Sequence, residues 1–168
     1  MKAAIVAALA FAVLTSGSAH AQPLPTAKGF WEEVDDQGKV GAWFYFTEKD
    51  GLYSGRLVRM FKKPGEPTFT VCSKCQGDQK NARMLGLTIV SGMKRDGLKY
   101  TEGSILDPRD GTIYHAQMEL SEDGNKLSVR GYLGIPLLGQ TQVWNRLPDD
   151  TIAAADIPKE VLAPAPKP

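Results

Sequence analysis

Residues 110–133 read DGTIYHAQMELSEDGNKLSVRGYL, and this stretch decides the fold. It contains two Asp-Gly pairs, and each pair is followed by a run in which apolar and polar side chains alternate. Glycine adopts the positive φ angles of a tight hairpin turn, because it has no Cβ atom that would clash. Alternation with a period of two is typical of a strand that is buried on one face. The stretch therefore predicts antiparallel strands joined by hairpins.

Turn signals of the same kind recur at Gln37-Gly38, Asp50-Gly51 and Asp96-Gly97, between runs rich in β-branched and aromatic residues. Only residues 77–83 have a mildly helical composition, which disfavours an α/β fold. We expect nine strands, at Gly29–Asp35, Lys39–Glu48, Leu52–Phe61, Thr68–Val71, Met84–Met93, Leu98–Leu106, Thr112–Leu120, Lys126–Leu133 and Gln140–Leu147.

Strands that follow one another without covering helices leave exposed sheet edges, and closure into a barrel removes those edges. The sequence therefore predicts an all-β fold, an antiparallel up-and-down β-barrel of about eight to nine strands. A sandwich of two sheets is the alternative.

The first 21 residues have the order of parts of a secretory signal peptide. Met1-Lys2 is followed by an apolar run from Ala3 to Leu14, and Ala19-His20-Ala21 forms an A-x-A cleavage pattern. The apolar run is shorter than the roughly 20 residues that span a bilayer as a helix. We expect an exported protein, periplasmic or secreted, whose mature chain has no transmembrane segment.

The mature chain is expected to comprise a barrel domain, residues 22–147, and a flexible Pro/Ala-rich tail, residues 148–168. The tail holds five of the 11 prolines and no aromatic residue, so it buries little apolar area. Loss of Lys2 with the signal peptide leaves 20 − 1 = 19 basic residues against 19 acidic ones. A formally neutral domain has no general electrostatic attraction for nucleic acid.

The two cysteines stand in the motif Cys72-Ser-Lys-Cys75. An oxidising compartment and the absence of other cysteines favour a structural disulfide. A thioredoxin-type redox pair needs the first cysteine at a helix N-terminus, which the pattern does not provide. A zinc site needs four ligands, and carboxylates would have to complete it, so no metal is expected.

No catalytic constellation stands out, and the chain is not expected to be an enzyme or to need a cofactor. Asp107 and Asp110 lie close together, but Asp-Pro and Asp-Gly pairs form turns and both carboxylates fit that role. His115 stands alone on the polar face of its strand and is expected to be exposed.

Three stretches resemble the exported bacterial family catalogued as domain of unknown function 2147. They are Gly29-Phe30-Trp31, residues 103–114 and residues 127–146, together with the Cys-x-x-Cys motif. The resemblance covers residues 27–147 and implies a lipocalin-like barrel that binds a small, partly apolar ligand. It also implies that Arg146 packs on the ring of Trp31 and joins the last strand to the first, an interaction of roughly 0.5–2 kcal/mol.

We therefore expect an exported protein that binds a small, uncharged or weakly charged molecule inside the barrel. Trp43 and Tyr45 are expected to face outward or to lie under a loop. Alternatives are an envelope interaction module with a filled barrel, and a thiol-active protein that uses Cys72 and Cys75. The candidate lining residues are those that alternation places on apolar faces, namely Phe44, Phe46, Tyr114, Met118, Val129 and Val143.

Overall fold

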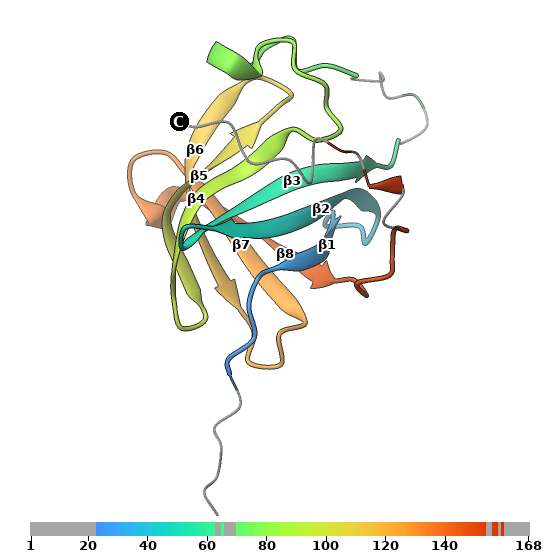
Figure 1. The fold of residues 1–168 in the computed structure, drawn as a ribbon. Helices are drawn as coiled ribbons and strands as arrows, with labels where there is room; N and C mark the ends of the chain where they lie inside the picture. Colours follow the sequence, from blue (N-terminus) through green and yellow to red (C-terminus); the bar gives the residue numbers. More distant parts are fainter. Residues whose placement is uncertain (1–22, 63–64, 66–69, 154–155, 158, 160–168) are drawn as a thin grey trace, which may run out of the picture.

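The computed structural model describes residues 23–62, 65, 70–153, 156–157 and 159. Within these residues the chain forms a closed antiparallel barrel in which each strand pairs with the next along the sequence and the last pairs with the first (Figure 1). The all-β barrel is confirmed, and the sandwich is excluded. The strands are β1 (Gly29–Val34), β2 (Val40–Lys49), β3 (Leu52–Met60), β4 (Thr88–Asp96), β5 (Lys99–Asp107), β6 (Thr112–Leu120), β7 (Lys126–Tyr132) and β8 (Gln140–Arg146).

The predicted hairpin turns lie where the sequence placed them. Gly51, Gly97, Gly111 and Gly124 connect consecutive strands, and their φ angles are 79°, 60°, 81° and 72°. These are left-handed conformations that side chains with a Cβ atom rarely adopt. The Asp-Gly pairs therefore fix where four of the hairpins turn.

One predicted strand lies partly outside the described residues. Residues 68 and 69 of the predicted strand Thr68–Val71 lie outside the described residues, and Val71 makes only an isolated bridge with Arg83. The next strand begins at Thr88 rather than at Met84. Eight strands already close the barrel, so this segment belongs to the long connection between β3 and β4, which contains the short 3-10 helix η1 (Gly77–Gln79).

The barrel has two different ends, because an up-and-down order places alternate connections at opposite ends. We call one end the closed end; it holds the chain that enters β1 and the β2–β3, β4–β5 and β6–β7 turns. We call the other end the open end; it holds the β1–β2, β3–β4, β5–β6 and β7–β8 connections. The last of these contains a second 3-10 helix, η2 (Pro136–Leu138).

The main core fills the closed half of the barrel and continues to the β3–β4 connection, where Cys72, Cys75, Met84 and Leu87 are buried in the same cluster. Its largest fully buried side chains include Trp31, Trp144, Tyr100 and Phe46. The rings of Tyr53 and Tyr100 meet edge to face, with their centroids 5.0 Å apart. These aromatic side chains leave the closed half filled by the protein itself.

A second, smaller cluster lies outside the barrel wall. Phe30 and Val58 are buried there together with Ile152, and Trp43 and Tyr45 pack against them. The expectation that Trp43 and Tyr45 face outward or lie under a loop is confirmed. Ile152 corrects the predicted flexible tail, because its burial fixes the start of that segment against β1 and β3. The rest of residues 148–168 lies largely outside the described residues.

Candidate functional site

Trp31 and Arg146 close the barrel, as the family resemblance implied. The Arg146 guanidinium lies 4.3 Å from the centroid of the Trp31 ring, and the two residues are paired between β1 and β8. The same guanidinium donates hydrogen bonds to the carbonyl oxygens of Gly124, Lys28 and Thr26, at 2.5, 2.8 and 2.5 Å. Burial lowers the pKa of Arg146.

Above this closure, two stacked aromatic rings cross the barrel. Phe44 of β2 and Trp144 of β8 lie with their centroids 4.3 Å apart and their planes 9° from parallel. Phe46 meets the Trp144 ring edge-on at 6.2 Å. A Cβ atom on Gly55 would lie 2.6 Å from the Phe46 ring, so glycine at that position gives the ring its space. We call the Phe44–Trp144 stack the aromatic floor.

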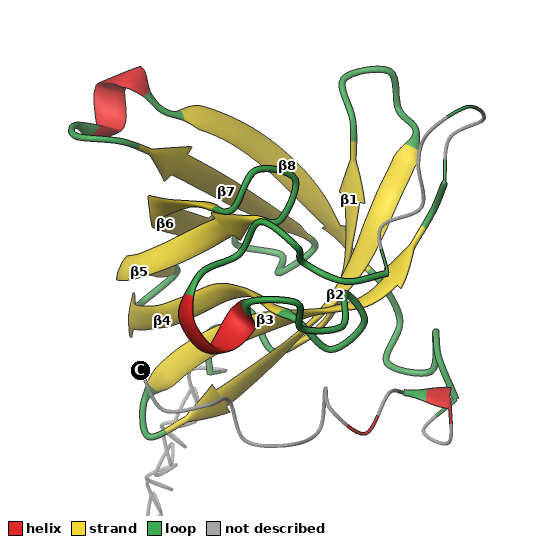
Figure 2. Ribbon diagram, turned by 90° about the horizontal axis from the view of Figure 1, so that it is seen from above, coloured by secondary structure: helices red, strands yellow, loops and turns green. Residues whose placement is uncertain are grey.

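The seam between β1 and β8 is much shorter than the other strand pairings. It contains only the pairs Trp31–Arg146 and Glu32–Asn145, whereas the other neighbouring strands share four to eight pairs. Beyond the seam β8 separates from β1, and the β7–β8 hairpin extends away from the rest of the barrel (Figure 2). The barrel is therefore closed at one end and flared at the other.

The flare exposes the inner face of β8. Gln140 and Gln142 share a strand face with Trp144, because side chains two residues apart point the same way. Trp144 is fully buried, but Gln142 and Gln140 are exposed to solvent. Solvent therefore reaches the inner wall directly above the aromatic floor.

A chain of polar contacts borders this opening. The Trp144 indole Nε1 donates to Gln142 Oε1 at 3.1 Å, and Gln142 Nε2 donates to Glu33 Oε1 of β1 at 3.4 Å. The two side chains thus connect β8 and β1 where their backbones no longer pair. They place amide and carboxylate groups beside an apolar surface.

The opposite wall of the open half is mostly apolar. Tyr114 is half-buried on the inner face of β6, and its register partner on β5 is Ile105. A Cβ atom on Gly131 would lie 3.1 Å from Ile105 and 3.6 Å from Tyr114, so these side chains cover the glycine closely. Met118 and Val129 lie deeper and are buried in the main core.

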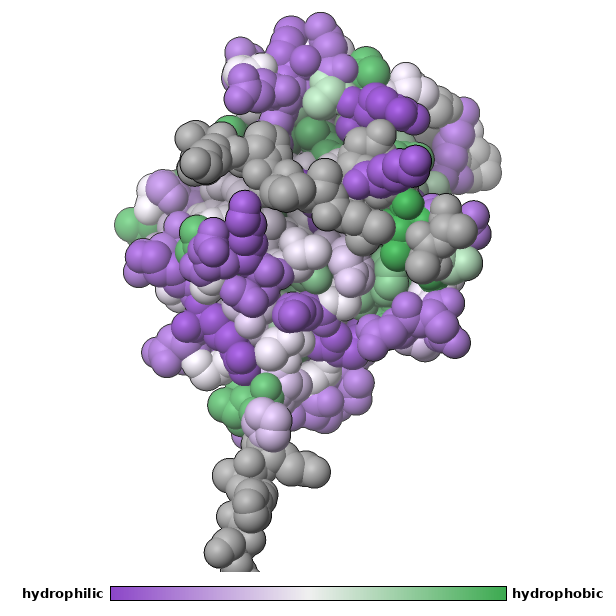
Figure 3. Space-filling model, in the orientation of Figure 1, coloured by the Kyte–Doolittle hydropathy of each residue, from purple (hydrophilic) through white to green (hydrophobic). Residues whose placement is uncertain are grey.

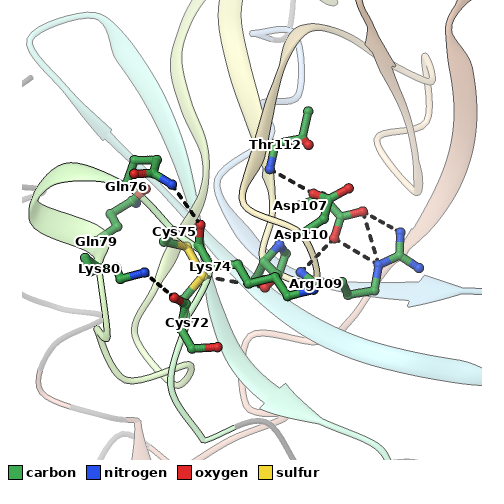
Figure 4. Close-up of a disulfide and its surroundings, with 12 residues drawn as sticks. Cys72, Lys74, Cys75, Gln76, Gln79, Lys80, Asp107, Arg109, Asp110 and Thr112 are labelled. Carbon is green, nitrogen blue, oxygen red and sulfur yellow. Dashed lines mark hydrogen bonds and ion pairs between the residues drawn. A yellow bond between two sulfur atoms is a disulfide. The ribbon is translucent and has the colours of Figure 1, made fainter.

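The rim of the open end is built from the β5–β6 turn and the segment that bears the disulfide (Figure 4). Cys72 and Cys75 form a disulfide, their Cα atoms are 5.4 Å apart, and both residues are fully buried. Cys72 lies against the carbonyl of Pro108, and a Cβ atom on Gly111 would lie 2.1 Å from the carbonyl oxygen of Lys74. The structural disulfide is confirmed, and it holds this segment against the turn.

The turn carries the acidic residues that the sequence assigned to turn formation. Asp107 accepts hydrogen bonds from the backbone and guanidinium of Arg109, and Asp110 accepts from the Thr112 backbone N–H at 2.8 Å. The side-chain hydrogen bond from Arg109 lowers the pKa of Asp107, and the same bond raises that of Arg109. The negative charges of Asp107, Asp110 and Glu33 also contribute to the raised pKa of Arg109.

The structure separates the six candidate lining residues into three groups. Phe44 belongs to the aromatic floor, and Tyr114 lies at the half-buried wall above it. Phe46, Met118 and Val129 point inward but are packed in the filled core.

Val143 was assigned to the wrong face. It is 48% exposed and lies outside the barrel, because its neighbour Trp144 fills the interior. Arg146 must face inward to reach Trp31, and Trp144 shares its face. The contact between Arg146 and Trp31, which the family resemblance implied, was therefore sufficient to place Val143 on the outer face. Sequence reasoning also missed Gln142 and Glu33.

Within the described part of the chain, no group of three or more potential metal ligands occurs. His115 is exposed, and its ring lies 5.5 Å from that of Tyr132. Among the same residues, no helix has the length and apolar character needed to cross a bilayer.

Comparison with solved structures finds a Helicobacter pylori protein whose structure is described as "Protein HP1028 from the human pathogen Helicobacter pylori belongs to the lipocalin family". The TM-score is 0.66 at 18% sequence identity, over 82% of this chain and 97% of the other. This likeness shows a shared lipocalin-like fold. A search of curated proteins gives no match. Residues 29–146, which span the whole barrel from the start of β1 to the end of β8, match the family described as "Uncharacterized protein conserved in bacteria (DUF2147)", and the chain therefore belongs to that family.

Proposed function

We propose that this protein binds a small, partly apolar molecule in the open half of its barrel, above the Phe44–Trp144 floor. One observation carries the proposal. Gln142 lies on the inner face of β8 and is exposed to solvent, whereas Trp144, two residues further along the same face, is fully buried. An inner wall that water reaches, over an aromatic surface, has the character of a small-molecule site. The lipocalin-like fold supports a binding role rather than catalysis.

The chemistry of the mouth suggests the ligand class. Tyr114 offers a half-buried aromatic surface, whereas Gln142 and Glu33 offer a hydrogen-bonding amide and a carboxylate on one side. A neutral molecule with an apolar body and a single polar group satisfies both. The Phe44 and Trp144 rings are 6% and 1% exposed, so a ligand reaches them only by displacing the side chains above them.

We further propose that the protein works in the periplasm or outside the cell. The signal-peptide pattern of residues 1–21 supports this location, although those residues lie outside the described part of the structure. A structural disulfide is also compatible with an oxidising compartment. Cell fractionation, with N-terminal analysis of the recovered chain, tests export, and a chain kept intact in the cytosol would contradict it.

The thiol-active alternative receives no support from the site. Thiol–disulfide exchange requires a thiolate to reach a sulfur atom, and both cysteines of the Cys72–Cys75 disulfide are fully buried. We therefore assign the disulfide a structural role at the rim.

The binding proposal is tested with N-phenyl-1-naphthylamine, a neutral dye that fluoresces in apolar sites. In Gln142→Trp a bulky side chain occupies the space above the aromatic floor, and we expect the affinity for the dye to fall at least about tenfold. Val143→Trp is the matched control, because it adds the same side chain one residue away on the outer face. Equal dye binding by the two variants, or no binding by the original protein, would contradict an internal site.

A further inference from the structure

Exposed apolar side chains gather at one end of this protein. Among the described residues, the exposed large apolar side chains of Leu24 and Leu52 lie at the closed end, Val143 lies in the middle of β8, and the others lie in the open half. The face drawn in Figure 3 is mostly hydrophilic, with hydrophobic residues showing in separate places. The densest group comes from one connection, between β7 and β8.

That connection exposes four large apolar residues within six positions. Leu133 and Ile135 are 58% and 55% exposed, and Leu137 and Leu138 are 82% and 77% exposed. Residues 133–139, which we call the β7–β8 tip, include η2 and lie at the outer end of the hairpin that flares from the barrel (Figure 2). The tip is convex and projects into solvent.

The direction of these side chains limits what can cover them. In a 3-10 helix successive residues point about 120° apart, so Leu137 and Leu138 face different sides of the tip. A protein surface laid against one side would leave the other side in water. A bilayer interface surrounds a projecting tip, and it would cover both leucines at once.

Part of the backbone of the tip is hydrogen-bonded within the chain. Arg130 donates through Nε to the Pro136 carbonyl at 2.7 Å and through a terminal nitrogen to the Leu137 carbonyl at 3.2 Å. The backbone N–H of Leu138 donates to the Ile135 carbonyl at 3.2 Å. Unsatisfied polar groups are costly in lipid, so internal bonding of these three carbonyls lowers the cost of insertion.

The tip is also free of formal charge. Residues 131–145 contain no Asp, Glu, Lys or Arg, and the nearest cation in the sequence, Arg130, is bonded to the tip carbonyls and to Thr141. We propose that the β7–β8 tip docks on a lipid bilayer by inserting Leu137 and Leu138 into its interfacial region. Docking of this kind depends on apolar burial rather than on anionic lipids. It would bring the flared mouth of the barrel to the membrane surface.

The test is co-flotation with vesicles of phosphatidylcholine, alone or with phosphatidylglycerol. It uses the purified chain as the expressing cell delivers it, with its N-terminus determined by mass spectrometry. We expect the double variant Leu137→Asp/Leu138→Asp to lower vesicle partitioning at least about tenfold on both lipid mixtures. Leu24→Asp is the matched control, because Leu24 is 54% exposed at the other end of the barrel.

A second measurement locates the contact. In Leu137→Trp the added indole should be quenched by brominated phosphatidylcholine, and its emission should shift to shorter wavelength when vesicles are added. Both tip variants are expected to melt as the original protein does, since the substituted side chains lie in solvent. Vesicle binding that survives the double variant, or an added indole that brominated lipid does not quench, overturns the proposal. A dimer seen by sedimentation that is lost in the double variant, without vesicle binding, assigns the tip to self-association instead.

Discussion

Replacing Arg146 by methionine tests how the barrel is closed. The change removes a cation from the Trp31 ring, 4.3 Å away, and removes the donors to the carbonyls of Gly124, Lys28 and Thr26. The ring interaction contributes about 0.5–2 kcal/mol, and leaving partly buried acceptors without donors costs about 1–3 kcal/mol. We therefore expect the free energy of unfolding to fall by about 2–4 kcal/mol, and Tm to fall by roughly 10 °C.

Urea denaturation followed by circular dichroism measures this loss, with an unchanged m-value showing that the same structure unfolds. Arg59 provides the matched control, because its guanidinium lies 5.0 Å from the Trp43 ring on the outer face of the barrel and its side chain is exposed. Arg59→Met should cost less than about 1 kcal/mol. If the two variants are destabilised equally, the closure does not depend on the buried guanidinium and the reasoning is refuted.

Three further predictions concern the rim and the turns. Replacing Cys72 and Cys75 by serine should lower the free energy of unfolding by about 2 kcal/mol, because the disulfide closes a very short loop; thermal melts check this. Gly111→Ala should cost about 2–4 kcal/mol in urea denaturation, since a Cβ atom would collide with the Lys74 carbonyl, whereas Gly38→Ala, with open space at φ 76°, should cost only about 1 kcal/mol. The hydrogen bond from Ser121 and those from Asn125 lower the pKa of Asp123 to about 2, so NMR should show its carboxyl titrating there. Its contribution to stability should be complete above pH about 4 and be lost as the pH falls through 2.

The sequence predicted the barrel because local and global signals agree. Asp-Gly turns need positive φ angles, and the strands between them alternate with a period of two, so both signals predict consecutive hairpins. The extra strand at Thr68–Val71 was predicted because a short β-branched run looks the same in a strand and in a loop. At its described end, Val71 makes only an isolated bridge with Arg83, and the eight strands close the barrel without it.

The mouth of the barrel was harder to predict. Gln140 and Gln142 look like ordinary solvent-facing residues, which suggests that they lie on the outer face. Alternation then places Val143 on the inner face, and this is the assignment that was wrong. Which face is inside depends on Trp144 and Arg146, whose contact residues Phe44 and Trp31 lie at least 100 residues away in sequence. The exposure of Gln142 further depends on the short β1–β8 seam, and no local pattern encodes the length of a pairing.

The inner face of β8 shows how one strand can serve both stability and binding. Along this face Arg146 holds the first strand, Trp144 forms the floor, and Gln142 borders the opening. The order follows from the seam, since β8 is paired with β1 only at Arg146 and Asn145. A longer seam would bury Gln142 and close the mouth, whereas a shorter one would leave Trp31 without its cation. The position at which the pairing stops therefore sets the boundary between the filled half of the barrel and the half that we propose binds a ligand.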